Sequence, residues 1–234
     1  DYVVNCAVVK MDKWDYDFAV NAEGVGHLMA RTAKAKGWVH FSTTGVYEYA
    51  GGHAPRKETD NLADNHRSMM LTYSLSKIAG ESVAKFAAKH FGIPTTIARL
   101  CVPYGDNGGW PYYHLLAMQG GHPIDVHPDR PNYYSLLHID DYVEKVPYLL
   151  NTGSPDATMV NFGGSEVVAI EEWCEYLGEL TGLKPVFRDN PKAFGSLAVD
   201  TTRMHELIGP TKVTWKQGIQ RMVKALAPNL LKAA

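Results

Sequence analysis

Short apolar runs alternate along the chain with longer stretches of helical period, and no repeat or low-complexity tract interrupts them. Runs rich in β-branched residues predict strands over residues 2–9, 38–42 and 95–100. Between them, apolar positions three and four residues apart predict helices over about 22–36 and 71–90. This alternation is typical of an α/β fold with a parallel sheet.

Glycine and proline predict where these two helices end. Gly37 is expected to close the first helix, and Gly92 with Pro94 to close the second. Beyond Gly105 the pattern loosens, and turn formers fill residues 106–111. The elements expected after this loop are helices over 112–119, 140–150, 170–181 and 212–226, and strands over 124–127, 159–162 and 186–188.

Composition and charge are those of an ordinary globular protein. Of the 234 residues, 45% are hydrophobic and 21% charged, and the net charge of −2 gives no basic face for nucleic acid. No apolar run approaches the ~20 residues needed to cross a bilayer, and the start lacks the layout of a secretory signal. We therefore expect a cytoplasmic protein with a small-molecule substrate and neither a nucleic-acid nor a membrane partner.

The cysteines and histidines do not predict a metal site. Cys6, Cys101 and Cys174 are far apart in apolar stretches, which is typical of buried free thiols. The ten histidines form no HExxH or similar cluster. We expect no metal.

Tyr73 and Lys77 lie one helical turn apart in the second predicted helix. Residues at this spacing share one helix face, and a nearby ammonium favours the phenolate of a tyrosine whose ordinary pKa is near ~10. Such a tyrosine can exchange a proton with a substrate hydroxyl or carbonyl. Taken alone, the spacing also fits a solvated helix face.

Three hydroxyl side chains, Ser42, Thr43 and Thr44, lie at the carboxyl end of the second predicted strand. Open α/β sheets bind ligands at the ends of their strands. Thr43 is therefore a candidate donor to the oxygen that Tyr73 would protonate. Hydroxyls that only form a turn are the alternative.

Together these residues resemble the extended short-chain dehydrogenase/reductases, also called the NAD-dependent epimerase/dehydratase family. The resemblance covers essentially the whole chain and follows the family's order. Its elements are Val4-Asn5-Cys6-Ala7 at the fourth strand, Asn21-Ala22-Glu23-Gly24 at a helix start, Ser42-Thr43-Thr44-Gly45-Val46-Tyr47, Arg99 to Gly105, His138-Ile139-Asp140-Asp141 and Asn161-Phe162-Gly163-Gly164.

The resemblance implies a Rossmann-like doubly wound parallel sheet with a smaller C-terminal α/β lobe. On this basis residues 1–105 form a partial Rossmann-like catalytic domain. Residues 106–234 form mainly a substrate-binding lobe, of which one strand or helix is allowed to return to the main sheet. The implied activity is that of an NAD(P)-dependent oxidoreductase or epimerase, which moves a hydride between a substrate carbon and the nicotinamide of NAD or NADP.

The resemblance also implies roles for individual residues. Tyr73 would move the proton, Lys77 would hold the tyrosine and the cofactor ribose, and Thr43 would orient the substrate oxygen. The expected cofactor contacts are Cys6, Ala7, Lys10, Asn21, Tyr73, Lys77 and Leu100. The expected substrate contacts are Thr43, Thr44, Val102 and Tyr134. For Lys10, an ordinary surface lysine is the alternative.

The glycine-rich turn that binds a cofactor pyrophosphate does not occur in these residues. The chain starts at the family's fourth strand, so a segment of roughly 60 or more residues is expected to be deleted, disordered or supplied from elsewhere. Gly24-Val25-Gly26 is not this turn, because it lies in a predicted helix and lacks the third glycine. We expect these residues alone to bind NAD weakly.

Two positions bear on the substrate. Nucleotide-sugar members of the family usually carry Asn at the position of Val102 and Arg at that of Tyr134, where both meet the diphosphate. The absence of these two diphosphate-binding side chains favours a smaller, less charged alcohol or ketone as the substrate, unless Arg99 or Arg130 binds a diphosphate in their place. A nucleotide-sugar epimerase or dehydratase is the alternative. The nearby aromatic residues, which could line a pocket or pack in the core, are Trp110, Tyr112, Tyr113, Tyr133 and Tyr134.

A non-catalytic binding or scaffold protein derived from the family is the alternative of another class. The missing glycine-rich turn favours it, and the intact Tyr73, Lys77 and Thr43 oppose it. The family also commonly forms homodimers through the two helices predicted over 22–36 and 71–90. The small residues that would permit close approach there, or pack against the sheet, are Ala79, Ala84, Ala87 and Ala88.

Overall fold

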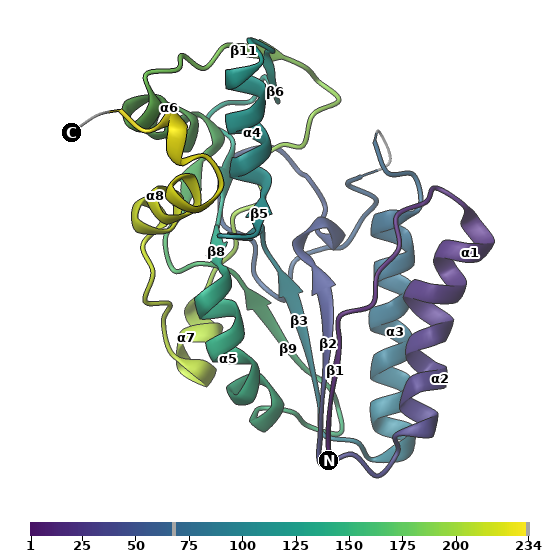
Figure 1. The fold of residues 1–234 in the computed structure, drawn as a ribbon. Helices are drawn as coiled ribbons and strands as arrows, with labels where there is room; N and C mark the ends of the chain where they lie inside the picture. The colour runs from purple at the N-terminus through teal and green to yellow at the C-terminus, as the bar shows by residue number, and fades with distance from the viewer. Residues whose placement is uncertain (67–68, 233–234) are drawn as a thin grey trace.

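A four-stranded parallel sheet forms the centre of the computed structural model, which describes residues 1–66 and 69–232 (Figure 1). Its strands, in spatial order, are β1 (Tyr2–Asn5), β2 (Gly37–Thr43), β3 (Thr95–Leu100) and β9 (Thr158–Phe162). The sheet and its helices confirm the predicted α/β fold. Strand β9 joins the sheet from the second half of the chain, beside β3.

Helices cover both faces of this sheet (Figure 1). On one face lie α3 (Tyr73–Phe91) and a helical stretch made of α1 (Trp14–Phe18), the π-helical turn η1 (Ala19–Glu23) and α2 (Gly24–Arg31). On the other face lie α5 (Ile139–Asn151) and α7 (Thr202–Ile208). Because side chains alternate along a strand, Trp38 packs into the core under α2 and α3, whereas Val39 and Phe41 pack into the core under α5.

A third core lies among α4 (Trp110–Gln119), α6 (Ile170–Thr181) and α8 (Trp215–Leu226). Short strands and 3-10 turns connect these helices to the sheet. They are η2 (Thr44–Val46), β4 (Pro103–Gly105), β5 (Gly108–Gly109), β6 (Ile124–Val126), β7 (Tyr133–Tyr134), β8 (Leu137–His138), β10 (Val168–Ala169), β11 (Phe187–Asp189) and η3 (Pro228–Leu230). The division of the chain at residue 105 stays a prediction.

The bounds of several elements match the sequence prediction. Strand β3 and helix α6 have the predicted ends, and α3 is followed by Gly92 in the left-handed conformation, with φ of 66°. The first helix was predicted wrongly: helical structure begins at Trp14 and ends at Arg31, and Gly37 opens β2 instead of closing a helix. The start was missed because contacts distant in sequence, and not local periodicity, hold the first turns.

The first strand is shorter and more exposed than predicted. It ends at Asn5, and residues 6–10 have no regular structure. Tyr2 and Val4 are 56% and 39% exposed, and among the described residues β1 pairs only with β2.

His114 lies buried in the third core and makes the stability of the protein depend on pH. Its Nδ1 accepts a hydrogen bond from the indole of Trp173 at 2.9 Å, and burial lowers the pKa of His114 from 6.5 to about 4. Between these two pH values the unfolded chain binds a proton that the folded chain does not, so this group makes the protein less stable as pH falls.

Between pH 6.5 and about pH 4, His114 is expected to lower the free energy of unfolding by about 1.4 kcal/mol for each pH unit that the pH falls. Chemical denaturation at several pH values should therefore show that the free energy of unfolding falls less steeply with decreasing pH in His114→Asn. The side-chain oxygen of this asparagine can still accept a hydrogen bond from the indole. Equal acid slopes for the two proteins would show that His114 does not carry this dependence.

Within residues 1–66 and 69–232, no helix is both long and apolar enough to span a membrane. The same residues form no cluster of three or more His, Cys, Asp or Glu side chains suited to a metal ion.

Candidate active site

A cleft of about 700 Å³ lies at the carboxyl ends of β2 and β3, where it is lined by residues from both halves of the chain. Seven predicted site residues line it: Lys10, Thr43, Thr44, Tyr73, Leu100, Val102 and Tyr134. Four do not: Cys6, Ala7, Asn21 and Lys77. A second hollow of about 710 Å³, near Lys57 and Arg203, contains none of the predicted residues.

Tyr73 occupies the first turn of α3, and its ring faces the cleft. Burial raises the pKa of the Tyr73 phenol, and hydrogen bonding with the Thr43 side chain opposes this shift. The phenol is therefore protonated at neutral pH. This direction is opposite to the lowering that we expected from Lys77.

The Lys77 side chain reaches the backbone of β2. Its Nζ donates to the carbonyl oxygen of Phe41 at 2.7 Å, and the side chain is almost completely buried. Burial lowers the pKa of Lys77 to about 8. The ammonium thus fixes the Tyr73 helix to β2, and it does not line the cleft.

A different lysine lies against the Tyr73 ring. The Nζ of Lys10 is 4.3 Å from the ring centroid, within the range of a cation–π contact. The backbone on both sides of Lys10 is held by buried side chains. Asn21 accepts from the Val9 amide and donates to the Val9 carbonyl, each at 2.9 Å, and Asp17 accepts from Met11.

The side-chain amide of Asn21 also donates to the Ser76 hydroxyl at 2.9 Å. Its polar groups are thus used to connect the Lys10 segment to α3. Cys6 and Ala7 are exposed just beyond the end of β1, outside the lining of the cleft.

The hydroxyl side chains at the carboxyl end of β2 lie where the sequence predicted. Thr43 caps the short turn η2, and its Oγ1 accepts from the amide of Gly45 at 3.1 Å. The Ser42 hydroxyl lines the cleft, is buried, and has no hydrogen-bond partner within the described part of the chain. Buried hydroxyls nearly always have a hydrogen-bond partner, so an unpaired one beside a cleft is a candidate for a functional role.

Aromatic side chains form the wall opposite β2. Trp110, Tyr113 and Tyr134 line the cleft, which was one of the two alternatives predicted for these aromatic residues. Tyr112 instead packs against the third core, and Tyr133 contacts the ring of His53. Among the lining residues that the sequence did not predict are His66 and Phe194, because each belongs to a loop without a periodic pattern.

Val102 lines the cleft in a strained backbone conformation. Its φ is 33°, in the left-handed region that β-branched residues rarely adopt. Asparagine tolerates this region, whereas threonine keeps the branched Cβ.

We therefore expect Val102→Asn to be more stable than Val102→Thr by about 1 kcal/mol, or ~2–4 °C in Tm for a chain of this size. Thermal unfolding of the two variants measures the difference. Equal Tm values, or a more stable threonine variant, would show that the backbone at this position is not strained.

Neither arginine that we considered as a diphosphate ligand lies in the cleft. Arg99 is buried in a two-pronged ion pair with Glu81, with contacts of 2.9 and 2.7 Å. Arg130 pairs with Asp189 at the surface. The suggestion that either compensates for Val102 and Tyr134 is therefore wrong, because both guanidinium groups are engaged elsewhere.

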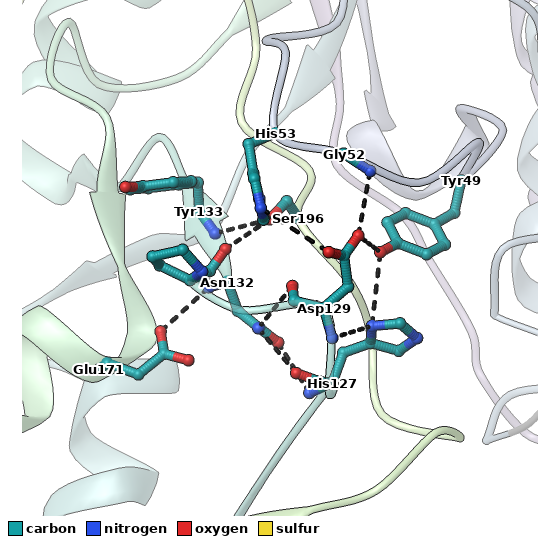
Figure 2. A network of polar contacts seen from close by, with 10 residues as sticks. Tyr49, Gly52, His53, His127, Asp129, Asn132, Tyr133, Glu171 and Ser196 are labelled. Atoms are coloured by element: carbon teal, nitrogen blue, oxygen red, sulfur yellow. Dashed lines mark hydrogen bonds and ion pairs between the residues drawn. The ribbon is translucent and has the colours of Figure 1, made fainter.

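A polar network beside the aromatic wall contains the residue types of a nucleophilic triad. Figure 2 shows His53 between Ser196 and Asp129, with its Nδ1 3.2 Å from the serine hydroxyl and its Nε2 3.8 Å from the carboxylate. The Ser196 hydroxyl, however, donates to the carbonyl of Pro131 at 3.0 Å and accepts from the Tyr133 amide. Its proton is therefore not available to a base, and the network is structural.

Known proteins resemble this chain in sequence and in fold. A model of the NAD dependent epimerase/dehydratase family matches residues 1–163. A Bacillus subtilis (strain 168) protein described as an uncharacterized UDP-glucose epimerase, YtcB, is 24% identical over 161 residues, which is 68% of this chain and 49% of that protein. The chain thus spans about half the length of the curated relative that it matches.

Two solved structures share the fold. UDP-glucose 4-epimerase from Thermotoga maritima, determined with UDP-glucose, has a TM-score of 0.81 at 21% identity and matches 98% of this chain and 78% of its own. The dTDP-glucose 4,6-dehydratase from Bacillus anthracis, determined with NAD, has a TM-score of 0.80 at 22% identity and matches 98% and 73%.

Proposed function

The chain belongs to the NAD dependent epimerase/dehydratase family, and from this premise we propose that it takes part in NAD(P)-dependent hydride transfer at a secondary alcohol or ketone carbon, with Tyr73 as the acid/base. The observation that carries the proposal is the cleft, which is lined by Tyr73 and Thr43 at the carboxyl ends of parallel strands.

The residues around Tyr73 fit the nicotinamide end of the cofactor. The Ser42 hydroxyl lacks a partner within the described residues, and the Lys10 ammonium lies over the Tyr73 ring. Leu100 supplies an apolar wall. When bound, NAD or NADP would accept or supply the hydride. Cys6, Ala7 and Asn21 would border the cofactor from the end of β1 and from η1.

In the direction of reduction, Tyr73 gives its phenolic proton to the substrate oxygen while the carbonyl carbon gains the hydride. Since burial raises the pKa of Tyr73, the proton is present at neutral pH. Thr43 lines the same cleft and would orient the same oxygen. Lys77 holds the tyrosine-bearing helix against β2 through its bond to Phe41.

A nucleotide-sugar epimerase or dehydratase is the second candidate, and the names of the similar proteins favour it. The cleft lining opposes it, because Lys10 is the one Lys or Arg side chain among the described residues that line the cleft. A non-catalytic scaffold is opposed by the convergence of Tyr73 and Thr43 on this cleft, since a scaffold has no need for it.

The experiment that tests the proposal is a substrate panel with the complete protein. We expect turnover of secondary alcohols with NAD or NADP, followed by the absorbance of the reduced nicotinamide. Conversion of UDP-sugars with no turnover of simple alcohols would favour the second candidate. Failure with the whole panel would favour the scaffold.

We also propose a homodimer through α2 and α3. Ala84, Ala87 and Ala88 are buried in the core between α3 and the sheet, which is the second of the two predicted alternatives for these small residues. Phe86, in contrast, is 68% exposed on the outer face of α3.

Exchanging Phe86 for glutamate should therefore shift the complete protein from dimer to monomer, since a buried charge without a partner is costly. Sedimentation measures this shift. The same exchange at Tyr148, an exposed residue of α5 on the other face of the sheet, should leave the dimer intact. A dimer that tolerates the Phe86 change would contradict this interface.

A further inference from the structure

His66 is a polar residue of the cleft that none of the assigned roles includes. Its ring lies edge-on to Tyr73, with centroids 5.2 Å apart, and against Phe194 at 4.4 Å. Gly45 lies directly against the His66 ring, because a Cβ at this position would overlap the imidazole. The imidazole is thus held beside the proposed proton donor by contacts from three separate segments.

The hydrogen bonds of Ser74 determine which nitrogen of His66 carries the proton. The Ser74 hydroxyl donates to the carbonyl oxygen of Gly45 at 2.9 Å, so toward His66 its oxygen can only accept. It receives the His66 amide at 3.2 Å and lies 2.9 Å from Nδ1. Nδ1 is therefore the protonated nitrogen, and in the neutral ring Nε2 is an acceptor.

Two observations keep this acceptor available. Burial lowers the pKa of His66 to about 4, so the ring is neutral at physiological pH. Within residues 1–66 and 69–232, Nε2 has no hydrogen-bond partner, and it is not among the fully buried unpaired atoms.

The other side chains of the cleft leave His66 Nε2 as an acceptor that selects ligands carrying a hydrogen-bond donor. Trp110, Phe194 and Leu197 present apolar surface, and the hydroxyl of Tyr134 is used by the carbonyl of Gly195 at 2.6 Å. A phosphate or carboxylate carries only acceptors and would face the lone pair of Nε2 with no proton between them. A hydroxyl has the donor that Nε2 requires.

We propose that His66 is a specificity-determining residue whose Nε2 accepts a hydrogen bond from a substrate hydroxyl next to the reacting carbon. The substrate class is then an uncharged α-hydroxy ketone, or the corresponding vicinal diol, with an apolar remainder against the aromatic wall. This inference rests on the proposed function, because Tyr73 defines where the reacting oxygen lies.

A matched pair of ketones tests the proposal in the complete protein with NADH. 2-Hydroxyacetophenone and acetophenone differ only in the hydroxyl next to the carbonyl. We expect kcat/KM to favour the hydroxy ketone by about tenfold or more, the effect of leaving one buried acceptor unpaired. His66→Asn retains a donor toward Ser74 but lacks the outer nitrogen, so the ratio of the two kcat/KM values should fall toward one.

Nitrogen NMR of the labelled imidazole gives a readout that does not depend on turnover. The expected spectrum shows protonated Nδ1 and unprotonated Nε2, and the Nε2 resonance should move when 2-hydroxyacetophenone is added but not when acetophenone is added. A protonated Nε2, an unmoved resonance, or equal kcat/KM for the two ketones would overturn the proposal. Unchanged turnover in Tyr73→Phe would instead refute the proposed function, and the NMR result would still report on His66.

Discussion

Replacing Tyr73 with phenylalanine is expected to lower kcat of the complete protein by about 100-fold or more, the usual contribution of a positioned acid or base. The change removes only the phenolic oxygen and its proton, while the ring keeps its contacts with His66 and Lys10. Substrate affinity should change much less than kcat. Steady-state kinetics with a turned-over alcohol measures both.

Tyr113 provides the matched control for this experiment. It also lines the cleft, but it is 65% exposed and lies outside the polar group around Thr43. Removing its hydroxyl should leave kcat within a few-fold. If the Tyr73 variant kept most of its turnover, or if both variants lost the same amount, the phenol of Tyr73 would not be the proton donor.

Breaking the ion pair between Arg99 and Glu81 is expected to destabilise the protein by about 3–5 kcal/mol, because one buried charge is left without its partner. Both side chains are at least 98% buried, and they join β3 to the helix that carries Tyr73. Arg99 also donates to the Glu58 carbonyl and lies over the ring of Tyr47. Either Arg99→Met or Glu81→Met should therefore lower the denaturant midpoint strongly.

The double variant separates the charge from the packing. With both residues changed to methionine neither charge of the pair is left without its partner, so most of the loss should be recovered. A surface pair, Lys89 with Asp156, is 80% and 85% exposed, and Asp156→Asn should have little measurable effect. Additive losses in the double variant, or single variants as stable as the parent, would contradict this role.

The sequence predicted the parts of the fold that local pattern determines. Strand β3, helix α6 and the glycine stop after α3 follow from apolar period and turn chemistry, and the structure has them at the predicted positions. The helical stretch from Trp14 was missed because its first turn contains polar and aromatic residues without a clear period. Asp17 and Asn21 hold it through bonds to Met11 and Val9.

The candidate site was predictable by residue type but not by orientation. The spacing of Tyr73 and Lys77 places both on one helix, yet it could not show that the ammonium binds the Phe41 carbonyl. Lys10 contacts the Tyr73 ring from a loop distant in sequence and His66 from the loop that precedes α3, so no helical spacing connects either of them with it. Such contacts depend on how the chain folds back on itself, which a single sequence does not encode in any local pattern.

A crystal structure of the complete protein with NAD and a bound secondary alcohol would show whether Tyr73 contacts the reacting oxygen. We expect the alcohol oxygen at about 2.6–3.2 Å from the phenolic oxygen of Tyr73, within hydrogen-bond reach, with the Thr43 hydroxyl also at that oxygen. An alcohol bound in the cleft with its oxygen out of reach of Tyr73 would contradict the proposed role of Tyr73.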